Sequence, residues 1–307
     1  MILLVFCLSD TVTVRVKRTR QNQKICYIQQ SPVANLHYNV DALFDPECDV
    51  GAIFDTVALV QNINLRISIN SSGSMTVTGL SIYTTERLRL KKVDLNFTAV
   101  VLLPQFSTMV TYVPNLELEE VRVLIMKSQI SKFFGLAKDT ESIRVNNVHL
   151  NYTVQFTQHS YGIGYAASNS FLTNMTLTIS FTKFQSDSSK TASLFSDGGQ
   201  NLTIQDILVV ATLTADVNIG GLVHQFYGST FNMKFLFANF SIDSKLGSSY
   251  LVVHCNNVVI QLYESIIYGF FLNPLSQNKL GIVKNGGTAK MDVAAGKIQW
   301  DGAIDWM

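Results

Sequence analysis

The chain has 307 residues, of which 47% are hydrophobic and only 15% are charged, and its formal net charge is +1. This composition argues against a disordered polymer, and the near-neutral charge provides no field that would steer the chain to nucleic acid or to an anionic membrane. No stretch of about 20 apolar residues occurs, so we expect no transmembrane helix.

Residues 1–55 show no internal repeat, and we predict that they form an N-terminal segment or cap. The apolar run Ile2–Leu8 is similar to the core of a secretory signal, but it lacks a basic region before it and a small-residue cleavage site after it. A first strand or a misassigned start of the gene are the alternatives. The basic run from Arg15 to Lys24 is interpreted as a solvated segment, not as a nucleic-acid site.

The four cysteines fit no zinc-binding pattern, because none of them form a close C-x2-C pair. Cys26 and Cys48 lie near enough in the sequence for a disulfide within the N-terminal cap. Cys255 sits in an apolar run and is expected to be a small buried side chain.

A strand-forming pattern returns about every 28 residues over the clearly repetitive part of the chain, residues 88–285. Each copy has two apolar residues two apart, a two-residue break, and two more apolar residues two apart. Period 2 indicates a strand with one buried face, and the break indicates a corner or bulge. The copies start at Leu88, Leu116, Ile143, Ser170, Leu202, Phe231 and Val258, with spacings of 28, 27, 27, 32, 29 and 27 residues.

Three further features define the repeating unit. A column of hydroxyls follows the strand pair at Thr98, Thr153, Ser180, Thr212 and Ser241, with Met126 and Tyr268 as exceptions. A small residue then precedes a large one, as in Gly135–Leu136, Gly164–Tyr165 and Ser193–Leu194, which we interpret as the entry to a third strand. The corner pairs Lys91–Lys92 and Glu119–Glu120 would stack with opposite charge in adjacent turns.

These features predict an all-β fold, a parallel β-helix (solenoid) over residues 56–307 with about 28 residues and about three short strands per turn. The alternating residues Ile63, Leu65, Ile67 and Ile69 are interpreted as part of an earlier, degenerate turn. Ala289, Met291 and Val293 begin another unit near the C-terminus.

The stretch from Val217 to Ser229 resembles the glycine–leucine repeats called GLUG motifs, through Gly220–Gly221–Leu222–Val223 and then Gly228–Ser229. His224 stands where that motif usually has glycine. The resemblance implies a β-solenoid of the kind found in large surface proteins of bacteria and protists, often adhesive, and it brings no catalytic residues with it.

One constellation has the residue types of catalysis. Asp94, Arg122 and His149 occupy the same position in three successive repeats, opposite to the apolar face. Polysaccharide lyases and hydrolases use clustered acidic and basic groups on such a face, but a solvent-facing polar row is the favoured interpretation. No nucleotide, metal or hydrolase motif is present, so we expect no cofactor and no metal.

We therefore predict a non-enzymatic, extracellular or cell-surface repeat scaffold that binds a protein or glycan partner. The alternatives are a carbohydrate-active β-helix enzyme that uses Asp94, Arg122 and His149, and a fragment of a larger repeat protein. Six Asn-x-Ser/Thr sequons are compatible with secretion and N-glycosylation. They are Asn70, Asn96, Asn151, Asn174, Asn201 and Asn239.

Overall fold

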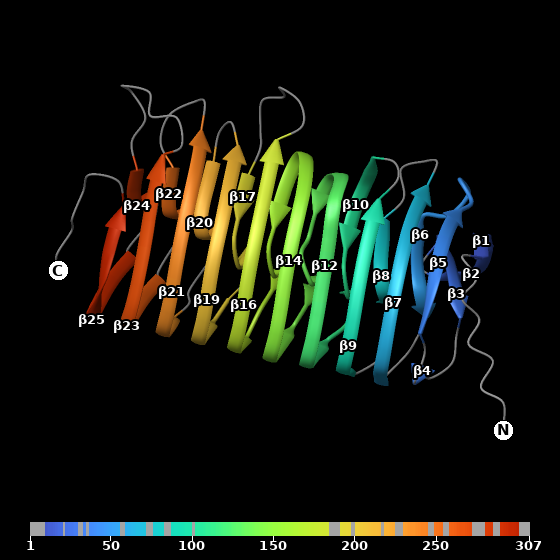
Figure 1. Ribbon diagram of the computed structural model, residues 1–307, viewed down its shortest axis with the longest axis horizontal. Coiled ribbons are helices and arrows are strands. Elements are labelled where there is room, and N and C mark those ends of the chain that lie inside the picture. Colours follow the sequence, from blue (N-terminus) through green and yellow to red (C-terminus); the bar gives the residue numbers. More distant parts are fainter. Residues whose placement is uncertain are drawn as a thin grey trace.

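The structure is a computed structural model in which every assigned element of the described residues is a β-strand. The strands stack side by side along one axis, from the N-terminal end to the C-terminal end (Figure 1). The described residues are 10–20, 22–29, 33–34, 37–55, 59–71, 76–82, 87–99, 102–183, 191–197, 200–215, 218–224, 230–244, 249–253, 258–271, 280–284 and 289–300.

Each turn of the solenoid contributes one long strand to a single sheet, which we call the long sheet. The long strands are β5 (His37–Phe44), β7 (Leu59–Ser71), β9 (Arg87–Ala99), β12 (Asn115–Phe133), β14 (Ser142–Tyr161), β16 (Ser170–Lys183), β19 (Leu202–Ala215), β21 (Thr230–Ser244), β23 (Val258–Phe271) and β25 (Ala289–Trp300). Each of them pairs in parallel with the long strand of the next turn.

Shorter strands return the chain behind the long sheet and stack in parallel in the same order. They are β6 (Val50–Asp55), β8 (Thr76–Ile82), β10 (Leu103–Ser107), β11 (Val110–Thr111), β13 (Ala137–Thr140), β15 (Gly164–Ala167), β17 (Thr191–Ser193), β18 (Ser196–Asp197), β20 (Asn218–His224), β22 (Ser249–Val253) and β24 (Leu280–Lys284). The predicted all-β parallel solenoid is confirmed.

The register confirms most of the predicted repeat. Leu116 pairs with Leu88 on one side and with Ile143 on the other, and Leu202 pairs with Ser170 and Phe231. In the hydroxyl column, Thr153, Ser180, Thr212 and Ser241 stack in that order. The early turn at Ile63 and the late unit at Ala289 are also present, as β7 and β25.

Two predicted alignments are wrong by two residues. Phe231 pairs with Ile260 and not with Val258, so Ser241 meets Phe270 in place of Tyr268. Gly164 pairs with Ala137, while Gly135 stacks against Gly162. A shift of two residues leaves the same side chains on the inner face of a strand, so the apolar pattern could not distinguish the two alignments.

The predicted corner is a column of residues with left-handed backbone conformation. Its members have φ between 47° and 55° and stack in register through the long sheet, at Asn62, Lys92, Glu120, Asn147, Asn174, Asp206, Phe235 and Glu264. One residue in this conformation turns the chain and shifts the alternation by one, which explains the two-residue break in each repeat. The corner residue itself is left out of the pairing, and in strands such as β12 and β14 the parallel ladder resumes in the same register beyond it.

The core is the interior of the coil, filled by one inward side chain of every two. Aliphatic columns such as Val93, Val121 and Val148 are at most 1% exposed. Aromatic rings continue the stack deeper in the coil: Phe106 lies 5.5 Å from Phe97 and 6.2 Å from Phe133, centroid to centroid. Because a single turn cannot cover its own apolar face, the stacking itself supplies the core.

The N-terminal strands extend the same stack. β1 (Asp10–Val14) pairs in parallel with β5, β3 (Gln23–Gln29) with β6, and β4 (Val33–Ala34) with β7. Only β2 (Val16–Arg20) pairs antiparallel, with β3, among the strands described. Parallel pairing therefore begins upstream of residue 56, and the basic run from Arg15 to Lys24 forms the hairpin at this end.

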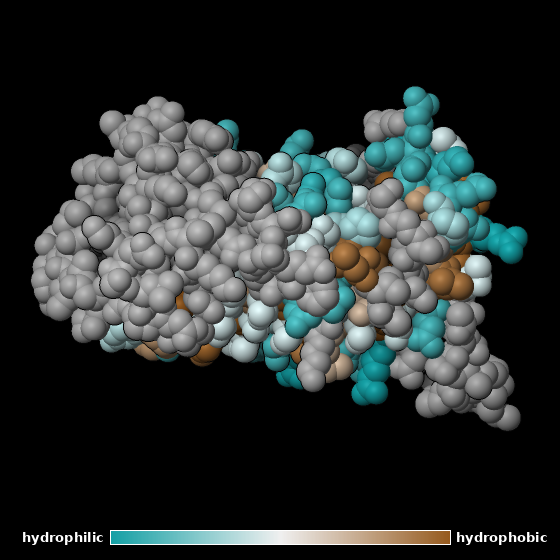
Figure 2. All heavy atoms as spheres, turned by 90° about the horizontal axis from the view of Figure 1, so that it is seen from above, coloured by the Kyte–Doolittle hydropathy of each residue, from teal (hydrophilic) through white to brown (hydrophobic). Residues whose placement is uncertain are grey.

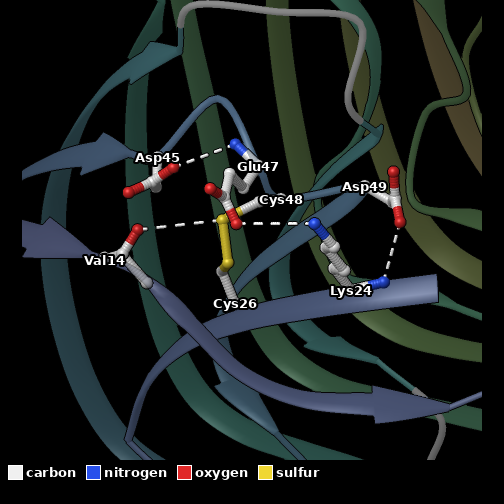
Figure 3. Close-up of a disulfide and its surroundings, with 7 residues drawn as sticks. All are labelled: Val14, Lys24, Cys26, Asp45, Glu47, Cys48 and Asp49. Carbon is white, nitrogen blue, oxygen red and sulfur yellow. Dashed lines mark hydrogen bonds and ion pairs between the residues drawn. A yellow bond between two sulfur atoms is a disulfide. The ribbon is translucent and has the colours of Figure 1, made fainter.

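A disulfide joins Cys26 of β3 to Cys48, with the Cα atoms 5.9 Å apart (Figure 3). Beside it, the backbone N–H of Lys24 donates to Asp49 Oδ2 at 2.7 Å, and Lys24 Nζ lies 3.4 Å from Glu47 Oε2. The crosslink closes a segment with a sequence separation of 22 residues, which corresponds to a stabilisation of about 3 kcal/mol from unfolded-chain entropy.

Three sequence-based interpretations fall outside this description. The signal-like run Ile2–Leu8 and Cys255 are not among the described residues, and of the GLUG-like stretch only the β20 backbone is. Within the described residues, no helix is long and apolar enough to cross a membrane. Seen from above, the described surface near the N-terminal end is largely hydrophilic, with small hydrophobic areas between (Figure 2).

Candidate binding surface on the long sheet

The outward face of the long sheet changes its chemistry along the stack. One column of outward positions, paired in register from β7 to β25, shows this change. It runs Asn64, Asp94, Arg122, His149, Thr176, Leu208, Phe237, Ile266 and Lys297. The column is polar over the first five strands, apolar over the next three, and polar again in sequence at β25.

The polar part lines a shallow groove of about 350 Å³, which we call the polar groove. Asp94, Arg122 and His149 lie on adjacent strands there, so the predicted row is confirmed as a column of exposed side chains. Neighbouring strands are about 4.8 Å apart. The other polar side chains lining the groove are Asn64, Arg66, Asn96 and Asn151.

The three predicted site residues share the groove without a hydrogen bond or an ion pair between them. Among the hydrogen bonds and ion pairs of the described residues, none joins Asp94, Arg122 or His149 to any of the others. A catalytic acid–base pair is normally oriented by such contacts, although substrate can tighten them. The arrangement offers separated donors and acceptors on an open face.

A charge network lies beside the polar groove, on the other side of the corner. Glu119 Oε1 is 2.8 Å from Lys91 Nζ, its Oε2 is 3.0 Å from Arg89 Nη2, and Arg87 pairs with Glu117. The predicted stacking of opposite corner charges is therefore confirmed for Lys91 and Glu119. Hydrogen bonds from Lys91 and then Arg89 lower the pKa of the Glu119 carboxyl.

The apolar part of the outward face was missed by sequence reasoning. We define the apolar patch as Leu208 and Val210 of β19, Phe235 and Phe237 of β21, and Tyr263, Ile266 and Phe270 of β23. Their exposed fractions run from 37% for Ile266 to 50% for Val210. The signal is present in the sequence, as apolar residues at outward positions of three successive repeats.

A second cluster of aromatic rings lies where the long strands β12 and β14 end and the short return strands begin. Lys138 Nζ is 5.1 Å from the ring centroid of Phe134 and 5.7 Å from that of Tyr112. Tyr161 stacks on Phe134 at 6.4 Å and on Tyr165 at 5.9 Å. Burial lowers the pKa of Lys138, partly opposed by the nearby carboxylate of Asp139. Its cation–π contacts and its hydrogen bond to Gln105 Oε1 make this cluster part of the packed structure.

The described sequons occupy two kinds of position. Asn96, Asn151 and Asn239 share one outward column of the long sheet, which also contains Leu124, Thr178 and Val210. Asn174 and Asn201 lie at corners with φ of 47°. The side-chain amide of Asn201 already donates to Asn169 Oδ1 at 2.9 Å. The side chain of Asn70 is outside the description.

No side-chain cluster of the described residues has the composition of a metal site, since no three His, Cys, Asp or Glu residues group together. No family model, no curated protein and no solved structure matches this chain. The fold therefore defines the protein as a parallel β-solenoid, and its candidate binding surface is the outward face of the long sheet.

Proposed function

We propose that this protein is a non-enzymatic extracellular scaffold that binds an acidic glycan in the polar groove of its long sheet. The main support for the proposal is that the guanidinium groups of Arg66 and Arg122 are available to bind a ligand. Both line the groove, and neither has a hydrogen bond or an ion pair among the described residues. Guanidinium groups bind carboxylate and sulfate groups through paired N–H donors.

The remaining groove residues suit a carbohydrate. Asn64, Asn96 and Asn151 supply amide donors and acceptors for hydroxyl groups, and His149 adds a ring nitrogen. Asp94 can accept a hydrogen bond from a sugar hydroxyl while limiting the net positive charge. Equivalent groups recur on successive strands, so an extended ligand could bind along the stack with several weak contacts.

The proposal requires that two of the sequons carry no glycan. Asn96 and Asn151 line the polar groove, so an N-glycan attached to either residue would cover the groove. The binding-competent protein must therefore be unmodified at both positions. Glycopeptide mass spectrometry of the secreted protein checks this, and full occupancy at Asn96 or Asn151 would rule out the groove as the binding site.

The direct test is binding of the full chain to an array of neutral and acidic glycans, followed by titration of the best acidic ligand. We expect Arg122→Ala to weaken binding at least tenfold, because a charge-assisted pair contributes about 1.5–3 kcal/mol. Lys17→Ala is the matched control, since it removes one exposed cation from the N-terminal hairpin. Equal weakening by both variants, or no acidic ligand at all, would contradict the proposal, and a cytosolic product would contradict the extracellular assignment.

The alternative of a carbohydrate-active enzyme has one observation in its favour. Asp94 and Glu120 line the same surface hollow together with Arg122 and His149, which brings two carboxylates near one another. A lyase or hydrolase working there would degrade the bound acidic polysaccharide, and Asp94→Asn would abolish the degradation while leaving binding intact. Unchanged ligand length after prolonged incubation favours the scaffold.

A further inference from the structure

The apolar patch is near the upper end of what the free surface of a monomer presents. Aromatic side chains carry about 150–250 Å² each, so at the exposed fractions given above the seven residues present roughly 550 Å² to solvent. The largest apolar patch on a typical monomer is about 300–600 Å², and contiguous patches of this size usually mark an interaction site. The patch lies on strands that the polar groove does not include.

The central column of the patch is flanked in register by residues of polar type. In the central column, Thr176 precedes Leu208 on one side, and Lys297 follows Ile266 on the other. The apolar stretch therefore spans three adjacent strands and then ends. A polar rim around an apolar centre is the usual anatomy of a protein–protein interface.

We propose that the chain associates face to face with a second copy of itself through the apolar patch. Beyond the corner, the outward face of the long sheet presents rows of side chains about 4.8 Å apart in one direction. Another sheet with the same spacing can interdigitate with these rows at a distance of about 10 Å. A second copy of this solenoid has that spacing and carries the same apolar rows.

The area agrees with a dimer. Two patches packed together would bury at most roughly 1,100 Å² of apolar surface, which just passes the minimum of about 1,000 Å² for a specific interface and is below the range of about 1,200–2,000 Å² typical of stable ones. The interface would be isologous, because the same residues contribute from both copies. We therefore expect a dimer that dissociates measurably on dilution and not an obligate one.

The charges at the edge of the patch do not oppose self-association. Lys234 Nζ lies 4.8 Å from the ring centroid of Phe235 and 5.4 Å from that of Tyr263. Asp206 and Glu264 flank these residues at the corner column. Both signs are present on the same edge, so two copies bring together mixed charges and not two fields of one sign.

A glycan at the Asn239 sequon would be expected to block the association. Asn239 is paired between Val210 and Tyr268, within the area of the patch. An N-glycan there would cover the apolar side chains and prevent sheet-to-sheet contact. The proposal therefore requires that Asn239 is unmodified in the associating protein.

The test is sedimentation velocity of the full chain over a range of micromolar concentrations, with protein from bacterial and from eukaryotic expression. We expect a monomer–dimer equilibrium whose dissociation constant rises at least tenfold in Phe237→Lys. The matched control is Thr176→Lys, which adds the same charge to the same column one strand outside the patch. Because Thr176→Lys also removes the sequon at Asn174, both variants are compared in protein from bacterial expression, where the dissociation constant of the control should match the wild type. Circular dichroism verifies that both variants are folded, and Val210→Lys replaces Phe237→Lys if that variant unfolds.

Three results would overturn the proposal. They are a monomer at every concentration, an equal effect of Phe237→Lys and Thr176→Lys, and a dimer that persists with a glycan at Asn239. Loss of glycan binding is read out separately, since the polar groove lies on other strands. If the polar groove binds no acidic glycan, the sedimentation experiment still tests the association.

Discussion

Gly162 is the position where the tight approach of adjacent turns can be tested most directly. A Cβ atom added there would lie 1.8 Å from the carbonyl oxygen of Leu194 and 2.9 Å from its carbonyl carbon. Both are backbone atoms of the next turn, so no side chain can rotate away. To bring the closer contact to 3.0 Å, the two turns would have to separate locally by about 1.2 Å.

That separation would break backbone hydrogen bonds between the turns. The N–H of Gly162 donates to Ser193 O at 3.1 Å, and the N–H of Ile163 donates to Phe195 O at 2.7 Å. Leaving two such buried groups unpaired costs about 1–3 kcal/mol each, whereas alanine gains about 0.4–1 kcal/mol by restricting the unfolded chain. We expect Gly162→Ala to lower the free energy of unfolding by about 1–6 kcal/mol.

The assay is urea denaturation followed by circular dichroism, with Thr176→Ala as the control on the outward face. The control should stay within about 0.5 kcal/mol of the wild type. If Gly162→Ala is as stable as the wild type, or more stable, the close packing of the turns at this corner is wrong.

Two further predictions concern single side chains. Glu119 has its pKa lowered by Lys91 and Arg89, so its stabilising contribution is present above the unfolded pKa, near 4.5, and is lost as the pH falls below it. The stability difference between wild type and Glu119→Gln should therefore shrink on acidification, and a difference that is independent of pH would argue against this network. The buried Tyr152 hydroxyl makes no hydrogen bond of ordinary geometry, and the nearby Thr108 hydroxyl already donates to Gly135 O, so Tyr152→Phe should unfold at an equal or higher temperature, with a gain of up to about 1 kcal/mol. A loss above 1 kcal/mol would reveal a bond to that hydroxyl.

The architecture could be predicted from the sequence because the apolar residues at inward positions recur with the period of the coil. A parallel coil repeats its buried residues in every turn, so the alternation around Leu116, Ile143 and Leu202 gives both strand type and period. The corner was predicted as a break, but its left-handed conformation was not, since its members range from Asn147 to Phe235 and share no residue type.

The surface could be predicted only in part. The column of Asp94, Arg122 and His149 followed from the spacing of the repeats, because residues one period apart must stack. Whether their side chains contact one another depends on rotamers, which the spacing does not determine. The apolar patch depends on which outward residues lie on neighbouring strands, and the two-residue error at Val258 would have misplaced Ile266 and Phe270 within it.

The arrangement of turns also determines how the molecule loses structure. Each long strand pairs with strands of the adjacent turns, as β14 does with β12, β16 and β17, so the stability of a turn depends on its neighbouring turns more than on the whole molecule. Openings should begin at the terminal turns and move inward one turn at a time. Amide hydrogen exchange would then record a gradient, slowest around β12, β14 and β16, and the disulfide between Cys26 and Cys48 would slow the advance from the N-terminal end.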